Sequence, residues 1–301
     1  MFIKKFLYKI TDPRKHHEYK INLAIERKKK WYKLNFQDKI STIQKKIHNQ
    51  KEISFLHSGH LGDIIDSLAV IKELSKTHKC SLYIEANKTI DVKYNKHPGG
   101  KVFLNKKMVN MILPLLKKQN FIDQVNLYES QEVDIDLNLF KELAMNLGLG
   151  SVRWYSHVTG IYADLSKPYL ISEPHKTIKN KIVIMRTNRR NNYLINYRFL
   201  NKYNDLLFIG LLDEYNILKK EVPNIEFYDC KDFLELTEII KSCKFFLGNL
   251  CFGYSVAEAL KVPRLLECVS EYSAMHPSGQ NAYEFYFQEH FEKWFKHLYN
   301  L

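Results

Sequence analysis

The sequence has 301 residues, of which 45% are hydrophobic, and a formal net charge of +13. This is enough apolar material for two domains with buried cores. No apolar run reaches the roughly 20 residues needed to cross a bilayer, which excludes a spanning helix, and the first ten residues lack a signal-peptide core. Five scattered cysteines form no C-x-x-C pair, which favours a reduced, cytoplasmic protein.

The positive charge is concentrated at the start of the chain. Residues 1–51 hold 15 Lys and Arg against four Asp and Glu, so they carry +11 of the net charge. Apolar residues recur there near helical spacing, and the basic run Arg27–Lys30 precedes Trp31 and Tyr32. We expect two basic amphipathic helices that lie on an anionic membrane surface, or that pack on the body or on another subunit. Nucleic acid is a third partner for such charge, but no nucleic-acid-binding motif accompanies it.

The first α/β unit follows this arm. Residues 52–57 predict a buried strand, residues 58–63 a glycine-bearing loop, and residues 64–74 a helix with an apolar stripe. With a second strand over residues 80–85 they form a βαβ unit, whose polar loop lies at the carboxyl end of the first strand. The elements that follow are a turn within residues 94–104, a helix over 108–118, a strand over 121–128 and a helix over 137–147.

A second alternation of strands and helices follows residues 151–178, whose own pattern is mixed. The predicted strands cover residues 181–185, 206–210, 225–228, 244–247 and 264–267, and helices begin near residues 211, 233 and 252. The chain therefore predicts two Rossmann-like, doubly wound domains.

The stretch from Gly248 to Glu267 carries the most informative motif. It reads as strand, polar turn, helix and strand, and the turn lies where open parallel sheets bind ligands and helix starts bind phosphate. It resembles the closing motif of the family 9 glycosyltransferases, the heptosyltransferase-like group, G-N-D-[ST]-G-x-x-H-x-A-x-A-L-x-x-P. The matches are Gly248, Asn249, Ala257, Ala259, Leu260 and Pro263, and the three informative departures are Leu250, Cys251 and Ser255, as in a divergent branch of that group.

The resemblance implies a GT-B fold, in which two such domains face a central cleft. Residues 1–51 would form the basic helical arm, 52–170 the acceptor domain, 171–280 the nucleotide-sugar domain, and 281–301 a C-terminal helix that crosses back to the first domain. The implied activity is metal-independent, inverting transfer from a nucleotide-sugar to a glycan or glycolipid, as in lipopolysaccharide or surface glycan biosynthesis. The implied place is the cytoplasm or the inner face of the membrane, and no cofactor is expected.

Two other functions stay open for the same fold. Leu250 and Ser255 replace the acidic residue and the histidine of the motif, which is consistent with a nucleotide-sugar-binding or scaffold protein without turnover. The other function is a sugar-nucleotide epimerase, which needs one nucleotide-sugar and no acceptor.

Asp63 is the expected catalytic base. It closes Gly59-His60-Leu61-Gly62-Asp63, which is similar to the family's G-x-x-G-D signature, and one carboxylate suffices for a single displacement. The competing role of Asp63 is to cap the helix that it precedes. His57 and His60 are candidate acceptor contacts.

The negative charge of the donor diphosphate would be stabilised by cationic side chains and by the N-termini of helices. Arg186 and Arg189 follow the first strand of the second half, and the planar guanidinium of arginine suits phosphate oxygens, although a solvated basic loop would look the same. The further candidate donor contacts are Glu214, Asn249, Cys251, Phe252, Gly253, Glu258 and Glu267. Asp134 and Asp136 have D-x-D spacing, but their apolar neighbours argue against a metal site.

Overall fold

The computed structural model describes residues 8–90, 98–142, 150–272 and 274–301. The chain divides into two compact units, which are an arm that ends at Asn49 and a body over residues 50–301. The predicted turn within residues 94–104 and the predicted helix over 137–147 each lie partly outside the described residues.

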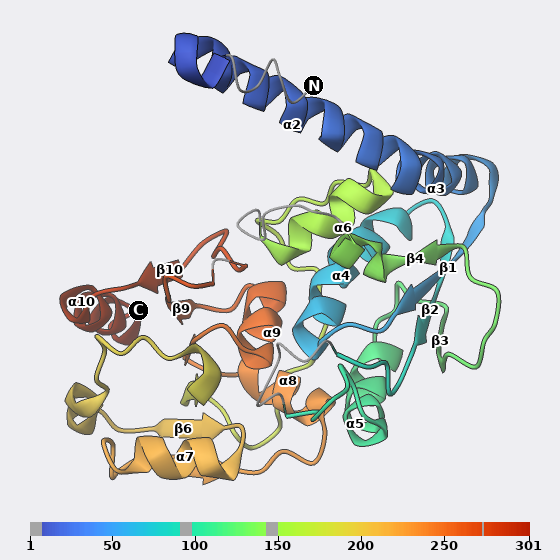
Figure 1. Ribbon diagram of the computed structural model, residues 1–301. Helices are drawn as coiled ribbons and strands as arrows, with labels where there is room; N and C mark the ends of the chain where they lie inside the picture. Colours follow the sequence, from blue (N-terminus) through green and yellow to red (C-terminus); the bar gives the residue numbers. More distant parts are fainter. Residues whose placement is uncertain (1–7, 91–97, 143–149, 273) are drawn as a thin grey trace. The chain divides into compact units, whose positions relative to one another are not determined.

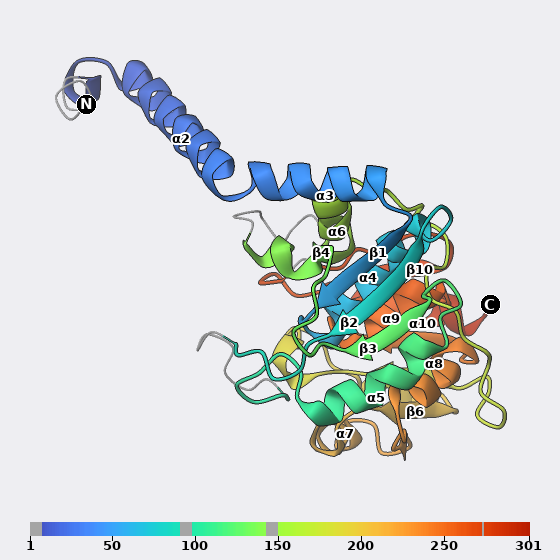
Figure 2. The same cartoon turned by 90° about the vertical axis from the view of Figure 1, so that its right-hand side faces the viewer.

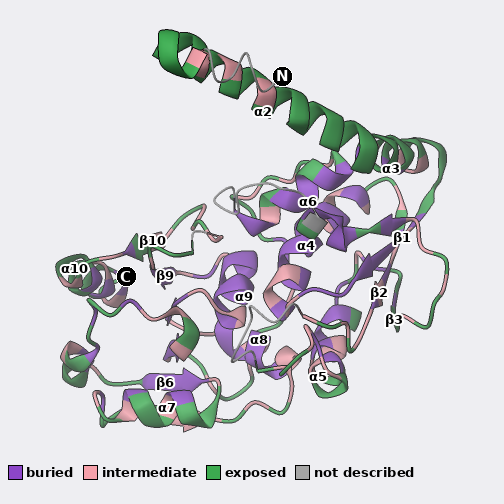
Figure 3. Cartoon of the chain, in the orientation of Figure 1, coloured by how far each residue is buried: buried purple, intermediate pink, exposed green. Residues whose placement is uncertain are grey.

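The arm consists of two helices, α2 (Pro13–Asn35) and α3 (Gln37–Asn49). Asp12 caps α2, because its Oδ1 accepts hydrogen bonds from the backbone N–H groups of Arg14 and Lys15 at 3.0 and 3.1 Å. No residue of α2 is buried, and Figure 3 accordingly draws this helix in green and pink. None of the described helices has an apolar stretch long enough to span a bilayer. The two predicted helices are present, but the apolar residues of α2 are not gathered on one face, so the amphipathic pattern expected for it is absent.

The first half of the body contains a four-stranded sheet. Its strands are β1 (Glu52–His57), β2 (Lys79–Ile84), β3 (Gln124–Leu127) and β4 (Ile135–Asp136), in the spatial order β3-β2-β1-β4. Each neighbouring pair is parallel, and Figure 2 shows β1, β2 and β3 side by side. The helices of this half are α4 (Leu61–Leu74), α5 (Lys106–Lys117) and α6 (Ser151–Thr159). Parallel strands need such crossover helices, and the βαβ prediction is confirmed.

The second half contains a six-stranded parallel sheet with the order β10-β9-β8-β5-β6-β7. The strands are β5 (Ile182–Met185), β6 (Leu206–Ile209), β7 (Glu226–Tyr228), β8 (Phe245–Gly248), β9 (Arg264–Glu267) and β10 (Ala282–Phe285). The helices are α7 (Leu212–Lys219), α8 (Phe233–Lys241), α9 (Phe252–Leu260) and α10 (Gln288–Tyr299). The two predicted doubly wound domains are both present (Figure 1).

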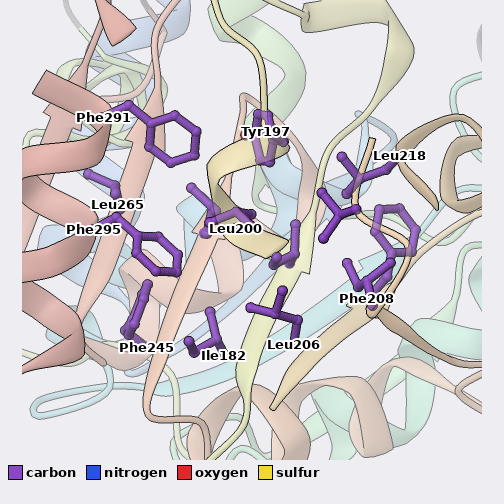
Figure 4. Packing of buried hydrophobic residues seen from close by; sticks show 14 of the residues in the cluster. Ile182, Tyr197, Leu200, Leu206, Phe208, Leu218, Phe245, Leu265, Phe291 and Phe295 are labelled. Atoms are coloured by element: carbon purple, nitrogen blue, oxygen red, sulfur yellow. The ribbon is translucent and has the colours of Figure 1, made fainter. Parts of the chain in front are cut away.

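The C-terminal segment departs from its prediction. Residues 281–301 contain an edge strand, β10, before the helix, and α10 packs on β9 and β10 of the second half. Phe291 and Phe295 of α10 belong to the hydrophobic core of that half, where Figure 4 shows them beside Phe245 and Leu200. The expected crossing to the first domain is wrong, because the aromatic face of α10 packs against the sheet of the second half.

Two further predictions in the first half need correction. The described part of the helix predicted over 137–147 is a short 3-10 helix, η1 (Leu137–Glu142). The mixed stretch after it contains α6, whose buried residues include Trp154 and Tyr155, and α6 packs against α4. Aromatic and β-branched residues in α6 hid its helical character from a propensity argument.

The two halves of the body meet through helices. Helix α4 contacts α9, and α5 contacts α8. Every residue of α9 from Gly253 to Leu260 is buried, because its own sheet covers one side and α4 and α8 cover the others. The N–H groups of Tyr169 and Leu170 donate to the carbonyl of Ala259, so the segment that connects the halves also packs on α9. A helix that is buried on all sides, such as α9, has apolar residues all around its axis.

Candidate active site

Each sheet has one topological switch point, and these two places define the candidate site. In the first half the chain reverses its direction of winding between β1 and β4, and in the second half between β5 and β8. Ligands of open parallel sheets bind outside the carboxyl ends of the strands at such points. The loops concerned are residues 58–60 and η1 in the first half, and residues 186–192 and 249–251 in the second.

Asp63 lies in the first turn of α4 at the first switch point. Its Oδ2 accepts a hydrogen bond from the His60 N–H at 3.1 Å, and Lys141 Nζ of η1 lies 3.9 Å away. The Asp63 side chain is 21% exposed, so it is held but still reachable from solvent. A Cβ on Gly59 would lie 3.0 Å from both Asp63 Oδ2 and Lys141 Nζ, which explains why glycine stands there. Both predicted roles, cap and accessible carboxylate, are therefore compatible with the same position.

Lys141 is a site residue that the sequence did not indicate. Its ammonium group lies 3.6 Å from the centre of the Phe103 ring, a cation–π contact, in addition to its approach to Asp63. Burial lowers the pKa of Lys141, and the charge of Asp63 opposes that shift. The only sequence signal for Lys141 is its place just beyond β4, which could be recognised only once β4 was paired with β1.

His57 is fully buried and has a structural role instead of the predicted contact with an acceptor. Its Nδ1 accepts from the Gly59 N–H, so the proton of the neutral ring resides on Nε2, which donates to the Tyr155 hydroxyl; both distances are 2.9 Å. Burial, followed by the positive charge of Lys141, lowers the pKa of His57 to about 3. A neutral imidazole thus fixes the turn that leads to Asp63.

His60 lies closer to the opposite wall of the site. Its ring packs edge-on against Phe103 at 4.9 Å between ring centres. Burial lowers the pKa of His60, and the charges of Arg189 and Arg190 from the second half contribute to that decrease. The loop after β5 is therefore within electrostatic range of the loop after β1, and the contact of Gly62 with Ser255 brings the first turns of α4 and α9 together.

Arg186 and Glu267, both predicted to contact the donor, bind each other. Arg186 Nε and Nη2 donate to the two Glu267 oxygens at 2.7 and 2.9 Å, and the guanidinium lies 4.5 Å from the centre of the Tyr197 ring. Glu267 also accepts from the Tyr197 hydroxyl and from the Asn192 N–H. Glu267 is 1% exposed, so this group holds the loop after β5 to the end of β9. A ribose or phosphate contact would require this buried ion pair to open.

Asn249 links the two loops of the second switch point. Its Oδ1 accepts from the Thr187 N–H at 2.9 Å, and its Nδ2 donates to the Thr187 carbonyl at 2.8 Å and to Asn191 Oδ1 at 3.2 Å. Asn249 is fully buried, so it shapes the site and leaves binding to its neighbours. Within the described part of the chain, the buried hydroxyls of Ser58 and Thr187, one at each switch point, have no hydrogen-bond partner. Such groups are uncommon in folded proteins unless a ligand or water satisfies them.

Arg189 is the exposed cation of this loop. No carboxylate of the described residues forms an ion pair with it, whereas Arg190 stacks on Tyr272 with its guanidinium carbon 3.2 Å from the ring centre. Glu214 approaches the same loop, since its Oε1 accepts from the Asn188 N–H at 3.2 Å, and burial raises the pKa of Glu214. Glu214 is therefore close to the predicted site as well as being a first-turn acid of α7.

The start of α9 offers backbone N–H groups to an anion. Cys251 is its N-cap residue, but the thiol forms no cap hydrogen bond, and burial raises its pKa to about 12, so it carries no charge. A Cβ on Gly253 would lie 2.8 Å from Met185 Sδ, so only glycine lets the helix approach β5 this closely. The Phe252 ring packs on Phe233 at 4.6 Å. A neutral cap leaves the positive end of the helix dipole available to a phosphate.

The predicted donor contact Glu258 and the two acids of the D-x-D pair have structural partners. Glu258 of α9 forms ion pairs with Lys261 and Arg264 below the predicted site. Asp134 accepts from the N–H and the hydroxyl of Ser54, and Asp136 accepts from Asn138, so the D-x-D pair ties β4 to its neighbours. Over residues 8–90, 98–142, 150–272 and 274–301, no three His, Cys, Asp or Glu side chains are grouped as metal ligands.

No protein family model matches the sequence, and no curated protein matches it. The structure, however, resembles solved heptosyltransferases. The E. coli heptosyltransferase WaaC in complex with ADP-2-deoxy-2-fluoro heptose superposes with a TM-score of 0.51 at 10% identity, over 78% of this chain and 92% of the other. The E. coli ADP-heptose lps heptosyltransferase II gives a TM-score of 0.52 at 11% identity, over 83% and 98%. The chain therefore has the GT-B fold of the family 9-like heptosyltransferases.

Proposed function

We propose that this protein is a glycosyltransferase that moves a sugar from a nucleoside diphosphate donor to a hydroxyl group of a glycan or glycolipid. The observation that carries the proposal is the contact of Gly62 with Ser255, which brings the Asp63 carboxylate of α4 near the uncapped start of α9 and the loop that contains Arg189. The likeness to WaaC, whose structure contains an ADP-heptose analogue, supports a nucleoside diphosphate as the donor's leaving group.

The proposed reaction is one displacement with inversion. The acceptor oxygen attacks the anomeric carbon while Asp63 takes its proton, and the bond between that carbon and the diphosphate oxygen breaks. Arg189, the N–H groups at the start of α9 and the Thr187 hydroxyl would stabilise the charge that develops on the diphosphate, with no metal ion. Lys141 would keep the Asp63 carboxylate oriented toward the acceptor.

The arm suggests where the reaction takes place. Helix α2 has no buried residue and includes the run Arg27–Lys30, while Ile21, Ile25 and Tyr32 are also exposed. A dense basic run on a helix with no buried residue suits electrostatic attraction to an anionic membrane surface. We propose the cytoplasmic face of a membrane as the place of the reaction, where a lipid-linked acceptor would be within reach.

A melting-temperature screen against ADP, UDP, GDP and CDP tests the donor half of the proposal. A nucleotide at about 100 times its dissociation constant should add about 2.7 kcal/mol to stability. Incubation of the matching nucleotide-sugars with lipid and glycan acceptors then tests transfer. A nucleotide shift without transfer or donor hydrolysis would indicate a binding protein. A new sugar-nucleotide formed without acceptor would indicate an epimerase, and the absence of any shift would overturn the proposal.

A further inference from the structure

A cavity of about 110 Å³ with polar and apolar lining residues lies beside the α4–α9 contact, at the end of α9 that carries Glu258. Its lining combines side chains from both halves of the body. Asp66 comes from α4, Ser151 from the start of α6, Tyr169 from the connecting segment and Glu258 from α9. Residues 274–278, which follow β9, complete it.

The cavity contains a buried hydroxyl group without a partner. Tyr169 is 4% exposed, and its hydroxyl has no hydrogen-bond partner among the described residues. After burial, the charges of Asp66 and Glu258 are the main causes that raise the pKa of Tyr169, so this hydroxyl lies near both carboxyl groups. A buried hydroxyl that forms no hydrogen bond costs free energy, and a ligand in the cavity would remove that cost.

Asp66 provides a second polar group with free capacity. It is 3% exposed, and its Oδ2 accepts from the Ser151 hydroxyl. No positively charged side chain forms an ion pair with Asp66 in the described residues, whereas Glu258 on the same wall is neutralised by Lys261 and Arg264. Apart from Arg153, whose side chain is exposed, the polar groups of the lining are hydrogen-bond acceptors and hydroxyls, and so the cavity suits a ligand rich in hydroxyl groups.

We propose that this cavity binds hydroxyl groups of a sugar residue of the acceptor, through Asp66 and Tyr169. The inference rests on the proposed glycosyltransferase function. Asp66 follows Asp63 by three positions on α4, so a sugar held in the cavity lies next to the base, and a neighbouring sugar of the same glycan can present its hydroxyl to Asp63. The volume accommodates several water molecules, and therefore the substituents of one ring face.

The test measures binding of free monosaccharides to the full-length protein by saturation-transfer NMR, with glucose, galactose, N-acetylglucosamine and mannose as probes. Wild type should bind at least one of them, also when the donor site is saturated with the nucleotide found in the melting screen. Tyr169→Phe and Asp66→Asn should each weaken that binding about five- to tenfold. Tyr254→Phe is the matched control, because Tyr254 is an equally buried tyrosine without a hydroxyl partner that does not line the cavity.

The outcomes separate this inference from the proposed function. Three results would overturn the cavity assignment: the nucleotide competes with the sugar, no sugar binds, or Tyr169→Phe binds the sugar as tightly as wild type. None of them would contradict nucleotide binding. Sugar binding lost in Tyr169→Phe but kept in Tyr254→Phe supports it even if no nucleotide binds. Tyr169→Phe should melt no lower than wild type, since it removes an unpaired group. Misfolding therefore does not account for a loss of binding in that variant.

Discussion

Gly62 of α4 and Ser255 of α9 lie in direct contact, so close that a Cβ on Gly62 would be 2.8 Å from Ser255 Oγ. Ser255 is 3% exposed and stands where the family 9 motif has a histidine. The absence of that histidine is therefore coupled to the packing of the two halves, because a larger side chain would have to displace α4.

The first prediction concerns this contact. Gly62→Ala would normally stabilise a helix by about 0.5–1 kcal/mol, but the clash with Ser255 should cancel that gain. In a Ser255→Ala background the clash is gone, so the same change should be stabilising. A double-mutant cycle by urea unfolding measures the coupling, which we expect to be about 1 kcal/mol. Additive effects of the two changes would contradict the contact.

The second prediction concerns the base. Asp63→Asn should reduce sugar transfer by a factor of about 10²–10⁴ and leave the nucleotide melting shift unchanged, since the amide still accepts from the His60 N–H. The control is Asp232→Asn, in which another aspartate that caps a helix start, that of α8, is changed. Equal turnover of wild type and Asp63→Asn would exclude the base assignment.

The third prediction separates the two arginines. Arg186→Met leaves Glu267 buried and unpaired, so we expect a loss of about 3–5 kcal/mol in the free energy of unfolding. Arg189→Gln should leave unfolding nearly unchanged and weaken nucleotide binding, because Arg189 forms no ion pair within the described chain. Urea unfolding and the nucleotide melting shift of both variants check this pattern, and the reverse assignment of effects would refute it.

The fourth prediction concerns pH. Burial raises the pKa of Asp66 from 3.8 to about 7, so the native protein binds a proton there that the unfolded chain has released. This contribution to stability is present below the unfolded pKa and is lost as the pH rises toward 7. The stability of wild type relative to Asp66→Asn should therefore fall between pH 4.5 and 6.5, by at most about 1.4 kcal/mol per pH unit.

Urea unfolding at three pH values measures this difference, and Asp164→Asn serves as its control. Hydrogen bonds from Ser166 lower the pKa of Asp164, so this exposed carboxylate stays ionised in both states over the same range. Its difference from wild type should not vary with pH. A pH-independent difference for Asp66→Asn as well would show that Asp66 is ionised in the native protein.

The fifth prediction concerns the arm. Replacing Arg27, Lys28, Lys29 and Lys30 by Gln should abolish sedimentation of the protein with phosphatidylserine vesicles, since each basic residue near such a surface contributes about 1 kcal/mol. The control replaces four exposed lysines at the two ends of α5, namely Lys106, Lys107, Lys117 and its C-cap Lys118. Vesicle binding that survives in the arm variant, or that is lost equally in the control, would contradict a membrane role for the arm.

The sequence predicted the order of the elements well, because buried parallel strands appear in it as short apolar runs and their helices as apolar residues at helical spacing. The loops after β1, β5 and β8 were also found, since Gly59, Arg189 and Asn249 follow such runs directly. Strand order was not visible, although it decides which loops meet. Lys141 was missed for that reason.

The roles of individual side chains could not be read in the same way. Arg186 and Glu267 are 81 positions apart, and each looked like a ligand contact until the fold placed them together. His57 likewise looked accessible because it ends a strand, yet Tyr155 covers it. Type and spacing locate a site, but only the fold shows which polar groups are already occupied.

The burial of α9 from Gly253 to Leu260 limits how this protein could be engineered. The first turn of α9 faces the proposed donor, and its sides pack against the first half. If the second half alone were replaced by that of a relative, the new α9 would not be complementary to α4. A functional chimera with a relative would have to transplant α4 and α9 as a matched pair.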